Sequence, residues 1–101
     1  MFRITVNYNH PEDPEQFLEH YRTVHAPLTV SMPGITSFEW GVCETLDGST
    51  PEHFVVGVVT FPSRDAAIAG LGSPEGEAGR NDMANFAGAG VVIDMHEVTT
   101  A

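Results

Sequence analysis

Apolar side chains occupy every second position from residue 2 to residue 8, where Phe, Ile, Val and Tyr alternate with Arg, Thr and Asn. This period of two is typical of a strand with one buried face. The same alternation in residues 35–43 predicts a second strand, and residues 89–98 predict the last one. Residues 54–61 are apolar on both faces and predict a third strand that is covered on both sides.

A helical period follows the first strand. Asp13 is a candidate N-cap, Pro14 fits the first helical position and Gln16 completes a capping box. Pro27 disfavours a helical conformation at Ala26, so the helix is expected to end or kink there. One arc of this helix carries its apolar residues and one histidine: Phe17, Leu18, Tyr21, Val24 and His25.

Two further helical segments are expected between the third and the last strand. Ser63 is the candidate N-cap of a short helix, and Ser73, followed by proline, is the candidate N-cap of the next. Gly76 and Gly79 would each cost about 1 kcal/mol inside a helix relative to alanine. The second of these helices is therefore predicted to be loose and short.

The predicted order is strand, helix, strand, strand, helical region, strand. This βαββαβ order is the ferredoxin-like arrangement of the α+β class, a four-stranded antiparallel sheet with its helices on one face. A chain of 101 residues fits a single domain, residues 1–101. Because helices cover only one face, the doubly apolar third strand predicts a second copy packed sheet to sheet, as a homodimer.

The composition of the chain limits the classes of partner that we expect. The formal net charge of -10 repels phosphate backbones and anionic lipids, so neither nucleic acid nor a membrane surface is an expected partner. The chain opens on a strand-like segment rather than a signal peptide, and no run approaches the roughly 18 apolar residues of a membrane span. Cys43 is the single cysteine and cannot form an internal disulfide. We expect a soluble, cytoplasmic protein.

Two segments resemble the signatures of EthD-like proteins. "HPEDPEQFLEHYRTVHAPLTVSMPGI" has the Tyr-x-x-x-His-x-Pro-Leu helix end before a Pro-Gly turn, and "GSPEGEAGRNDMANFAGAGVVI" has Ser-Pro-Glu-Gly, an Asp and an Asn-Phe pair before the last strand. Both match in order and spacing, and the likeness covers nearly the whole chain. The resemblance implies a dimeric α+β barrel.

The resemblance is less specific about chemistry. The family is named after a gene cluster for ether breakdown, and its members often carry a reductase label. Relatives with this fold include methylmuconolactone isomerases, fungal polyketide dehydratases and cyclases, and cofactor-independent monooxygenases, so the fold does not select a reaction. His25 matches the motif histidine that lactone-isomerising relatives use in catalysis, and Asp82 matches the aspartate before the Asn-Phe pair.

Histidine suits a general base because its ordinary pKa lies near neutrality. The end of a helix favours the imidazolium form of His25, whereas burial beside Tyr21 and Val24 favours the neutral form. The alternative is that His25 caps the unpaired carbonyl groups at the helix end.

The other candidates are aromatic or polar residues near the expected pocket. Tyr8 could place a phenol near a ligand or be a core residue with its hydroxyl at the rim. Phe38 and Trp40 could form an aromatic wall or plain core. Asn7, on the opposite strand face, is expected to look into the space between two sheets. The candidate substrate-binding residues are Asn7, Tyr8, Tyr21, Phe38, Trp40 and Asp82.

No metal or cofactor is predicted. His20 and His25 are five residues apart, about 140° around an α-helix, so they should not share a metal ion. No phosphate loop or dinucleotide fingerprint is present, and Cys43 has no CxxC partner.

Three functions remain open. The first is a small-molecule enzyme in which His25 moves a proton next to a carbonyl of a hydrophobic or aromatic-derived metabolite, in an isomerisation, dehydration or cyclisation. The second is an oxidoreductase or oxygenase accessory that works without a bound cofactor. The third is a ligand-binding dimer with no chemistry of its own.

Overall fold

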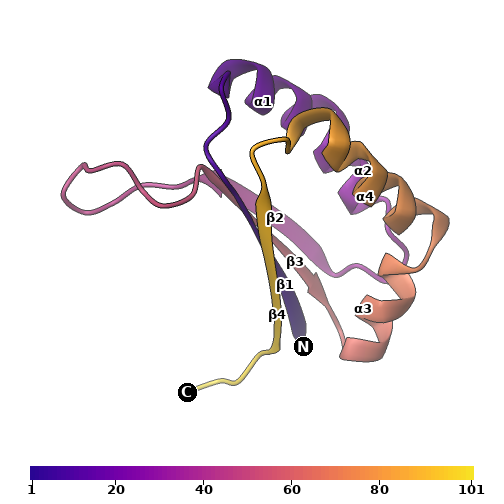
Figure 1. The fold of residues 1–101 in the computed structure, drawn as a ribbon. Helices are drawn as coiled ribbons and strands as arrows, with labels where there is room; N and C mark the ends of the chain where they lie inside the picture. The colour runs from indigo at the N-terminus through magenta and orange to yellow at the C-terminus, as the bar shows by residue number, and fades with distance from the viewer.

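Four strands form one antiparallel sheet in the order β2-β3-β1-β4 (Figure 1). In the computed structural model, which describes residues 1–101, the strands are β1 (Phe2–Tyr8), β2 (Ser37–Val42), β3 (Val55–Phe61) and β4 (Val91–Glu97). Tyr8, at the end of β1, lies opposite Val55 of β3 and Val91 of β4. The predicted ferredoxin-like sheet is confirmed.

All helices lie on one face of this sheet (Figure 1). Between β1 and β2 the chain forms α1 (Pro14–His20), the π-helical turn η1 (Tyr21–His25) and α2 (Ala26–Val30). Between β3 and β4 it forms α3 (Arg64–Leu71) and α4 (Pro74–Phe86). None of these helices is long and apolar enough to cross a membrane.

Of the end or kink expected at Ala26, the end is wrong. Ala26 keeps helical dihedral angles, φ -60° and ψ -45°, and the chain stays helical to Val30. The amide of Ala26 bonds to the carbonyl of Tyr21, five residues back, which is the hydrogen bond of a π-turn. Pro27 then falls in the first turn of α2, where its missing N–H group costs little.

The predicted loose, short second helix is also wrong, because α4 has 13 residues and is the longest helix. The Ser73 hydroxyl caps it by accepting a hydrogen bond from the amide of Gly76 at 3.1 Å. A Cβ atom at Gly76 would lie 2.4 Å from the carbonyl oxygens of Gly70 and Leu71. Glycine therefore costs helix propensity but allows α4 to approach the end of α3 closely.

The core lies between the helices and the sheet. Alternate residues of β1 point into it and are at most 7% exposed: Phe2, Ile4, Val6 and Tyr8. They pack with residues of α1, η1 and β3 that are also buried: Phe17, Tyr21, Val55, Val59 and Phe61. No helix covers the opposite sheet face (Figure 1), where Val56 and Val58 are half-buried.

Candidate functional site

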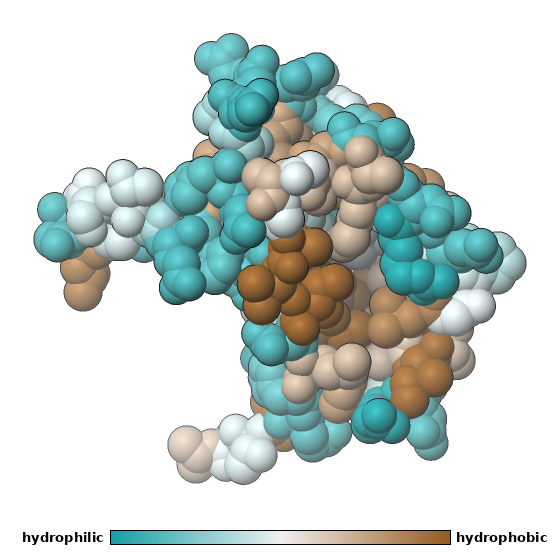
Figure 2. Space-filling model, viewed as in Figure 1, coloured by the Kyte–Doolittle hydropathy of each residue, from teal (hydrophilic) through white to brown (hydrophobic).

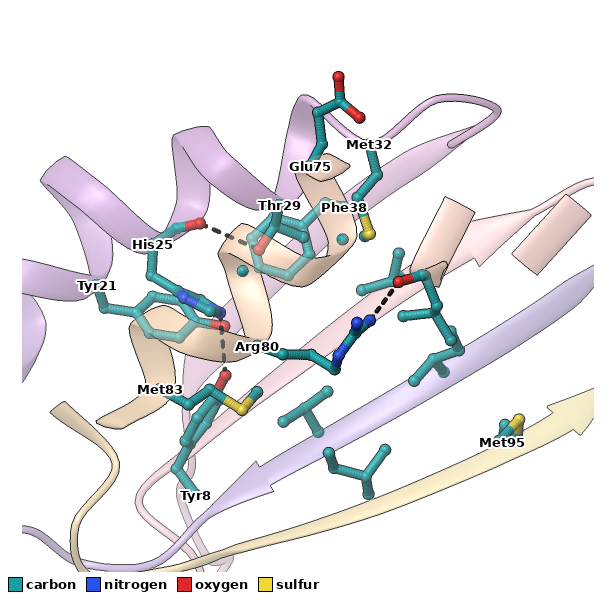
Figure 3. A pocket seen from close by; sticks show the side chains of 17 residues that line it. Tyr8, Tyr21, His25, Thr29, Met32, Phe38, Glu75, Arg80, Met83 and Met95 are labelled. Carbon is teal, nitrogen blue, oxygen red and sulfur yellow. Dashed lines mark hydrogen bonds between the residues drawn. The ribbon is translucent and has the colours of Figure 1, made fainter. Parts of the chain in front are cut away.

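A cavity of about 190 Å³ lies between the helices and the sheet, with mostly apolar walls (Figure 3). Four of its lining residues carry a polar group on η1, α2 or β1: Tyr8, Tyr21, His25 and Thr29. Glu75 and Arg80 of α4 also line it, and the Arg80 guanidinium donates a hydrogen bond to the carbonyl of Leu71. On the β4 side Ile93 and Met95 are 51% and 53% exposed. Figure 2 shows apolar side chains gathered over β4 beside the hollow beneath α4.

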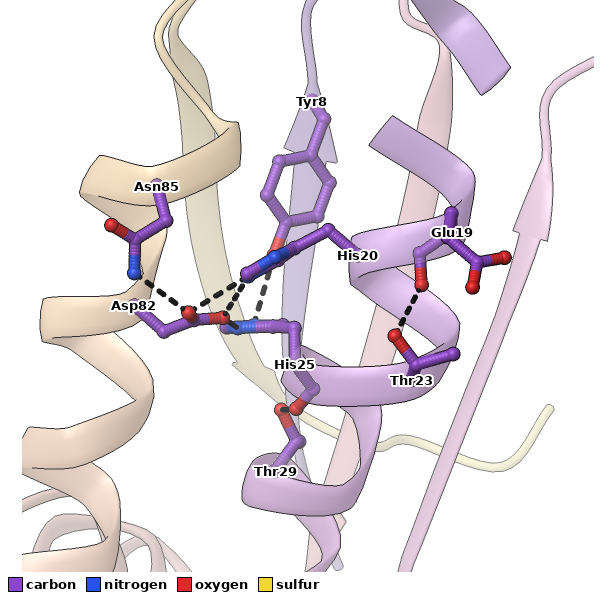
Figure 4. Close-up of polar contacts among 8 residues, drawn as sticks. All are labelled: Tyr8, Glu19, His20, Thr23, His25, Thr29, Asp82 and Asn85. Atoms are coloured by element: carbon purple, nitrogen blue, oxygen red, sulfur yellow. Dashed lines mark hydrogen bonds and ion pairs between the residues drawn. The ribbon is translucent and has the colours of Figure 1, made fainter. Parts of the chain in front are cut away.

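His25 is the histidine of this cavity and is buried, at 4% exposure. Its Nδ1 atom lies 3.0 Å from Oδ2 of Asp82, a carboxylate that α4 supplies and that is 6% exposed (Figure 4). Its Nε2 atom lies 3.4 Å from the Tyr8 hydroxyl, which β1 supplies. Both ring nitrogens therefore have partners, and His25 does not cap a helix end, since the helix continues to Val30.

Asp82 is the centre of a polar cluster (Figure 4). His20 places its Nε2 atom 2.8 Å and 3.0 Å from the two carboxylate oxygens. Asn85, one turn further along α4, donates its amide to Oδ1 at 3.0 Å. Two histidines and one amide therefore hold a single carboxylate.

The π-turn explains why both histidines reach Asp82. In an α-helix, residues five apart lie about 140° apart around the axis and point in different directions. This expectation is wrong for His20 and His25, because the segment between them is not α-helical. A π-turn is wider, so a spacing of five brings His20 and His25 to the same face. The Thr23 hydroxyl, on the exposed side of this turn, donates to the carbonyl of Glu19 at 2.7 Å.

The hydrogen bonds assign the tautomer of His25. An ionised carboxylate only accepts hydrogen bonds, so Nδ1 of His25 carries the proton that Asp82 accepts. The Nε2 atom of the neutral ring is then unprotonated, and its lone pair faces the Tyr8 hydroxyl at the cavity wall, which donates in the 3.4 Å contact. This is the arrangement of a base held in orientation by a carboxylate.

Burial and hydrogen bonding set the ionisation states. Burial lowers the pKa of His25, and the hydrogen bond and charge of Asp82 offset part of that effect. Burial opposes ionisation of Asp82, but hydrogen bonds from Asn85, His20 and His25 outweigh it and hold the Asp82 pKa below its ordinary value. Burial raises the pKa of Tyr21 to about 12 and raises the pKa of Tyr8 further. At neutral pH the cavity holds a neutral imidazole and protonated phenols.

Aromatic rings fix the position of the base. The Phe86 ring centroid lies 4.6 Å from that of His25, and the Tyr21 centroid lies 5.3 Å from it. Tyr21 in turn packs against Trp40 at 4.8 Å. The Arg22 guanidinium lies over the Trp40 ring, 5.9 Å from its centroid, at the distance of a cation–π contact.

The EthD domain family model matches residues 9–90. The chain belongs to the EthD domain family.

Two known proteins are similar to nearly the whole chain. A protein of Rhodococcus erythropolis, described as an uncharacterized 11.0 kDa protein in the thcB-thcC intergenic region, is 41% identical over 93 residues, which are 92% of this chain and 90% of the relative. The crystal structure of an EthD family protein of Bacillus halodurans is similar with a TM-score of 0.91 and 25% identity, covering 98% of this chain and 99% of that one.

A third likeness shows the fold alone. The cofactor-independent oxygenase SnoaB of Streptomyces nogalater is similar with a TM-score of 0.68 and 12% identity, covering 99% of this chain and 93% of that one. The ferredoxin-like fold of this EthD domain is thus shared with an enzyme that uses no cofactor.

The structure brings most of the predicted site residues of this EthD domain together. Of the predicted substrate-binding residues, Tyr8, Tyr21 and Phe38 line the cavity with His25. Asp82 and Trp40 do not line the cavity themselves. Asp82 bonds Nδ1 of His25, and Trp40 packs against Tyr21. Asn7 does not line the cavity, because alternation along β1 turns it to the opposite sheet face. Its expected place between two sheets stays a prediction.

Sequence reasoning missed His20 and Asn85. The only signal for Asn85 is its place in the Asn-Phe pair three residues after Asp82, a spacing at which helical side chains are neighbours. His20 escapes notice because α-helical geometry turns it away from His25, whereas the segment forms a π-turn. No group of three or more His, Cys, Asp or Glu side chains in the structure is arranged to hold a metal ion.

Proposed function

We propose that this EthD domain is a cofactor-independent enzyme that moves a proton next to a carbonyl of a small hydrophobic or aromatic-derived metabolite, with His25 as the general base. The observation that carries the proposal is the orientation of His25. Its Nδ1 atom is bonded to a buried carboxylate at 3.0 Å, and its Nε2 lone pair is directed to the wall of an apolar cavity.

Asp82, His25 and Tyr8 have separate roles in the proton transfer. Asp82 accepts the Nδ1 proton of His25, which fixes the tautomer and stabilises the imidazolium that forms on proton transfer. Nε2 takes a proton from the carbon next to the substrate carbonyl. The electron pair of that C–H bond forms a C=C bond as the π pair of the carbonyl moves onto its oxygen. The Tyr8 hydroxyl donates to this developing oxyanion, in place of its long 3.4 Å contact with His25.

The completed reaction returns a proton to the substrate. Protonation at a different carbon is an isomerisation, departure of a hydroxyl group with the returned proton is a dehydration, and attack of the carbanion on a second carbonyl is a cyclisation. All three share the first step, so His25 and Tyr8 serve each of them. The raised pKa of Tyr8 keeps its hydroxyl protonated throughout the neutral range, as a donor must be.

The cavity walls indicate the substrate class. Eleven of the 17 lining residues are hydrophobic. An apolar ligand gains from leaving water in such a cavity, while the few polar groups fix its orientation. Tyr8 is 1% exposed, and shielding from water strengthens its interaction with the oxyanion.

The second candidate is an oxygenase or oxygenase accessory. The fold shared with a cofactor-independent oxygenase favours it. The same deprotonation by His25 would produce an electron-rich carbanion that oxygen can oxidise. The third candidate, a ligand-binding dimer, requires the same cavity but no proton transfer.

The uncovered sheet face supports a homodimer. Val56 and Val58 of β3 and Val92 of β4 lie on the face that no helix covers, and Val92 is 46% exposed. Packing against a second copy of this sheet would remove these apolar side chains from water. Sedimentation equilibrium at micromolar concentration tests this, and a monomeric mass would contradict it.

Deuterium exchange in D₂O tests proton transfer. Candidate lactones and β-dicarbonyl compounds are incubated with the protein, and loss of the C–H signal next to the carbonyl is followed by NMR. We expect exchange with the wild type and at least a 100-fold loss in His25→Gln. His53→Gln, at a histidine of the loop between β2 and β3, is the matched control. Substrate-dependent oxygen uptake would favour the oxygenase, and binding without exchange or uptake would favour the ligand-binding dimer.

A further inference from the structure

Asp82 has two histidine partners with different surroundings. The side chain of His25 is 5% exposed and lines the apolar cavity, whereas the side chain of His20 is 26% exposed. His20 lines a second hollow of about 430 Å³ on the other side of the cluster, bounded by the start of α1 and the end of α4. The carboxylate of Asp82 therefore lies between a cavity-facing ring and a solvent-facing ring.

The contacts of His20 leave one nitrogen free for solvent. Its Nε2 atom is 2.8 Å from Oδ1 and 3.0 Å from Oδ2 of Asp82. The ring stacks on Phe86, with centroids 5.3 Å apart and planes at 28°. No protein group bonds its Nδ1 atom in the structure, and the open hollow gives water access to this side of the ring.

The cluster contains one negative charge for two imidazoles. Around His25, the titratable groups in contact are Tyr8 of β1, Tyr21 of η1 and Asp82 of α4. Around His20 they are Asp82, with Glu12 and Asp13 at the rim of the second hollow. One carboxylate balances one imidazolium within the cluster, and a second positive charge across the same carboxylate would be repelled.

We propose that His20 is a positioning residue for His25 that acts through Asp82 by charge exchange: when His25 takes a proton from the substrate, His20 releases one to solvent. This inference deepens the proposed function and rests on it for the substrate step. In the proposed exchange His20 starts as the imidazolium paired with Asp82. The substrate proton goes to Nε2 of His25, the Nδ1 proton of the His20 imidazolium goes to water, and the charge of the cluster does not change. The C–H electron pair stays on the substrate.

Charge exchange lowers the cost of protonating a buried base. His25 is 4% exposed, and burial disfavours its imidazolium form. Loss of charge at His20 leaves Asp82 free to stabilise His25 at the moment when the imidazolium forms. The proton itself does not need to travel from one ring to the other.

Two substitutions at His20 separate this role from a structural one. In His20→Gln the side-chain amide can still donate to Asp82 but carries no charge, and in His20→Arg the side chain can donate but carries a permanent charge. The titration of His25 is followed by NMR of labelled histidine, without substrate. We expect the His25 midpoint to rise by about half a pH unit or more in His20→Gln and to fall in His20→Arg.

The shape of the titration is a second readout. In the wild type the His25 curve should be broader than that of a single site, because the two rings share one counter-charge, and it should become a simple one-site curve in His20→Gln. His53→Gln is the control and should leave the His25 curve unchanged. Folding of each variant is verified by its amide spectrum. If His20→Arg does not fold, the result for His20→Gln is sufficient to test the proposal.

The outcomes are distinguishable from failure of the proposed function. An unchanged His25 midpoint in His20→Gln, or shifts in the same direction in both variants, would overturn charge exchange even if His25-dependent deuterium exchange were observed. Opposite shifts with no turnover of any substrate would leave the coupling of the two rings standing and reject the catalytic role, and with it the substrate step of the proposal.

Discussion

Nδ1 of His25 lies 3.0 Å from Oδ2 of Asp82, although the two residues are 57 positions apart in the chain. The contact depends on two local features. The π-turn η1 (Tyr21–His25) directs His25 toward α4, and the close approach of α4 at Gly76 fixes that helix against α3. The position of the base therefore depends on packing between the two helical connections of the fold.

Replacing Asp82 by asparagine should slow turnover while the protein stays folded. The amide has the size of the carboxylate but no charge, so it can neither stabilise the imidazolium of His25 nor select the tautomer as strongly. We expect kcat to fall by about 10²- to 10⁴-fold. Asp65→Asn, at an exposed position of α3, is the matched control. Equal rates for the two variants would reject a role for the Asp82 charge.

Stability should fall as the pH is lowered from neutrality. Burial holds the pKa of His25 below its ordinary 6.5, despite the opposing effect of Asp82. Below about pH 6.5 the unfolded chain therefore binds a proton at this residue that the folded protein does not, and the free energy of unfolding falls by up to about 1.4 kcal/mol per pH unit. The lowered pKa of Asp82 adds a second loss in more acidic solution, below its ordinary 3.8.

Urea unfolding at a series of pH values measures this dependence. His25→Gln removes the titrating ring, so the free energy of unfolding should become flatter between about pH 6.5 and pH 5. His53→Gln should keep the wild-type slope. An identical slope in His25→Gln would show that another group causes the acid lability.

Gly57 should not tolerate alanine. A Cβ atom there would lie 2.7 Å from the Tyr21 hydroxyl and 3.2 Å from the Phe38 ring, both of which line the cavity. We expect Gly57→Ala to lower the free energy of unfolding by about 1–3 kcal/mol and to weaken ligand binding. Gly41→Ala on the adjacent strand meets no atom within 4 Å and is the control, with little change expected in either measurement.

The two glycines of α4 should respond in opposite directions. In Gly76→Ala the methyl group would meet backbone oxygens, which cannot move aside, and we expect a loss of about 2–4 kcal/mol in the free energy of unfolding. Gly79 has open space around it, so Gly79→Ala should gain about 0.5–1 kcal/mol from helix propensity. Chemical unfolding of both variants tests this, and equal effects would contradict the close packing of α4 on α3.

Local sequence patterns are sufficient to predict the strands and the residues at which the helices begin. Alternation predicts β1, and the caps Asp13, Ser63 and Ser73 all accept the expected backbone hydrogen bonds. These features depend on a few neighbouring residues, which a sequence displays directly. The order of the elements then leaves the ferredoxin-like sheet as the arrangement to expect.

Features that depend on distant contacts are not predictable in this way. An extra residue in the π-turn leaves no mark in a 3.6-residue apolar period, which hides the shared partner of His20 and His25. Helix propensity predicts that Gly76 weakens α4, whereas the missing side chain allows α4 to approach Gly70 and Leu71 closely. Sequence spacing also gives no sign that Asp82 lies beside His25, since only the folded chain brings α4 to η1.

The loop of residues 43–54 extends away from the sheet and the helices (Figure 1), and Leu46 within it is fully exposed. Each of the three strand pairs, β1 with β3, β1 with β4 and β2 with β3, joins a strand before this loop to a strand after it. We expect a chain cut in the loop to give two fragments that contain no paired strands of their own and that regain the sheet only by complementation. Since His25 belongs to the first fragment and Asp82 to the second, proton-transfer activity would then report reassembly of the split protein.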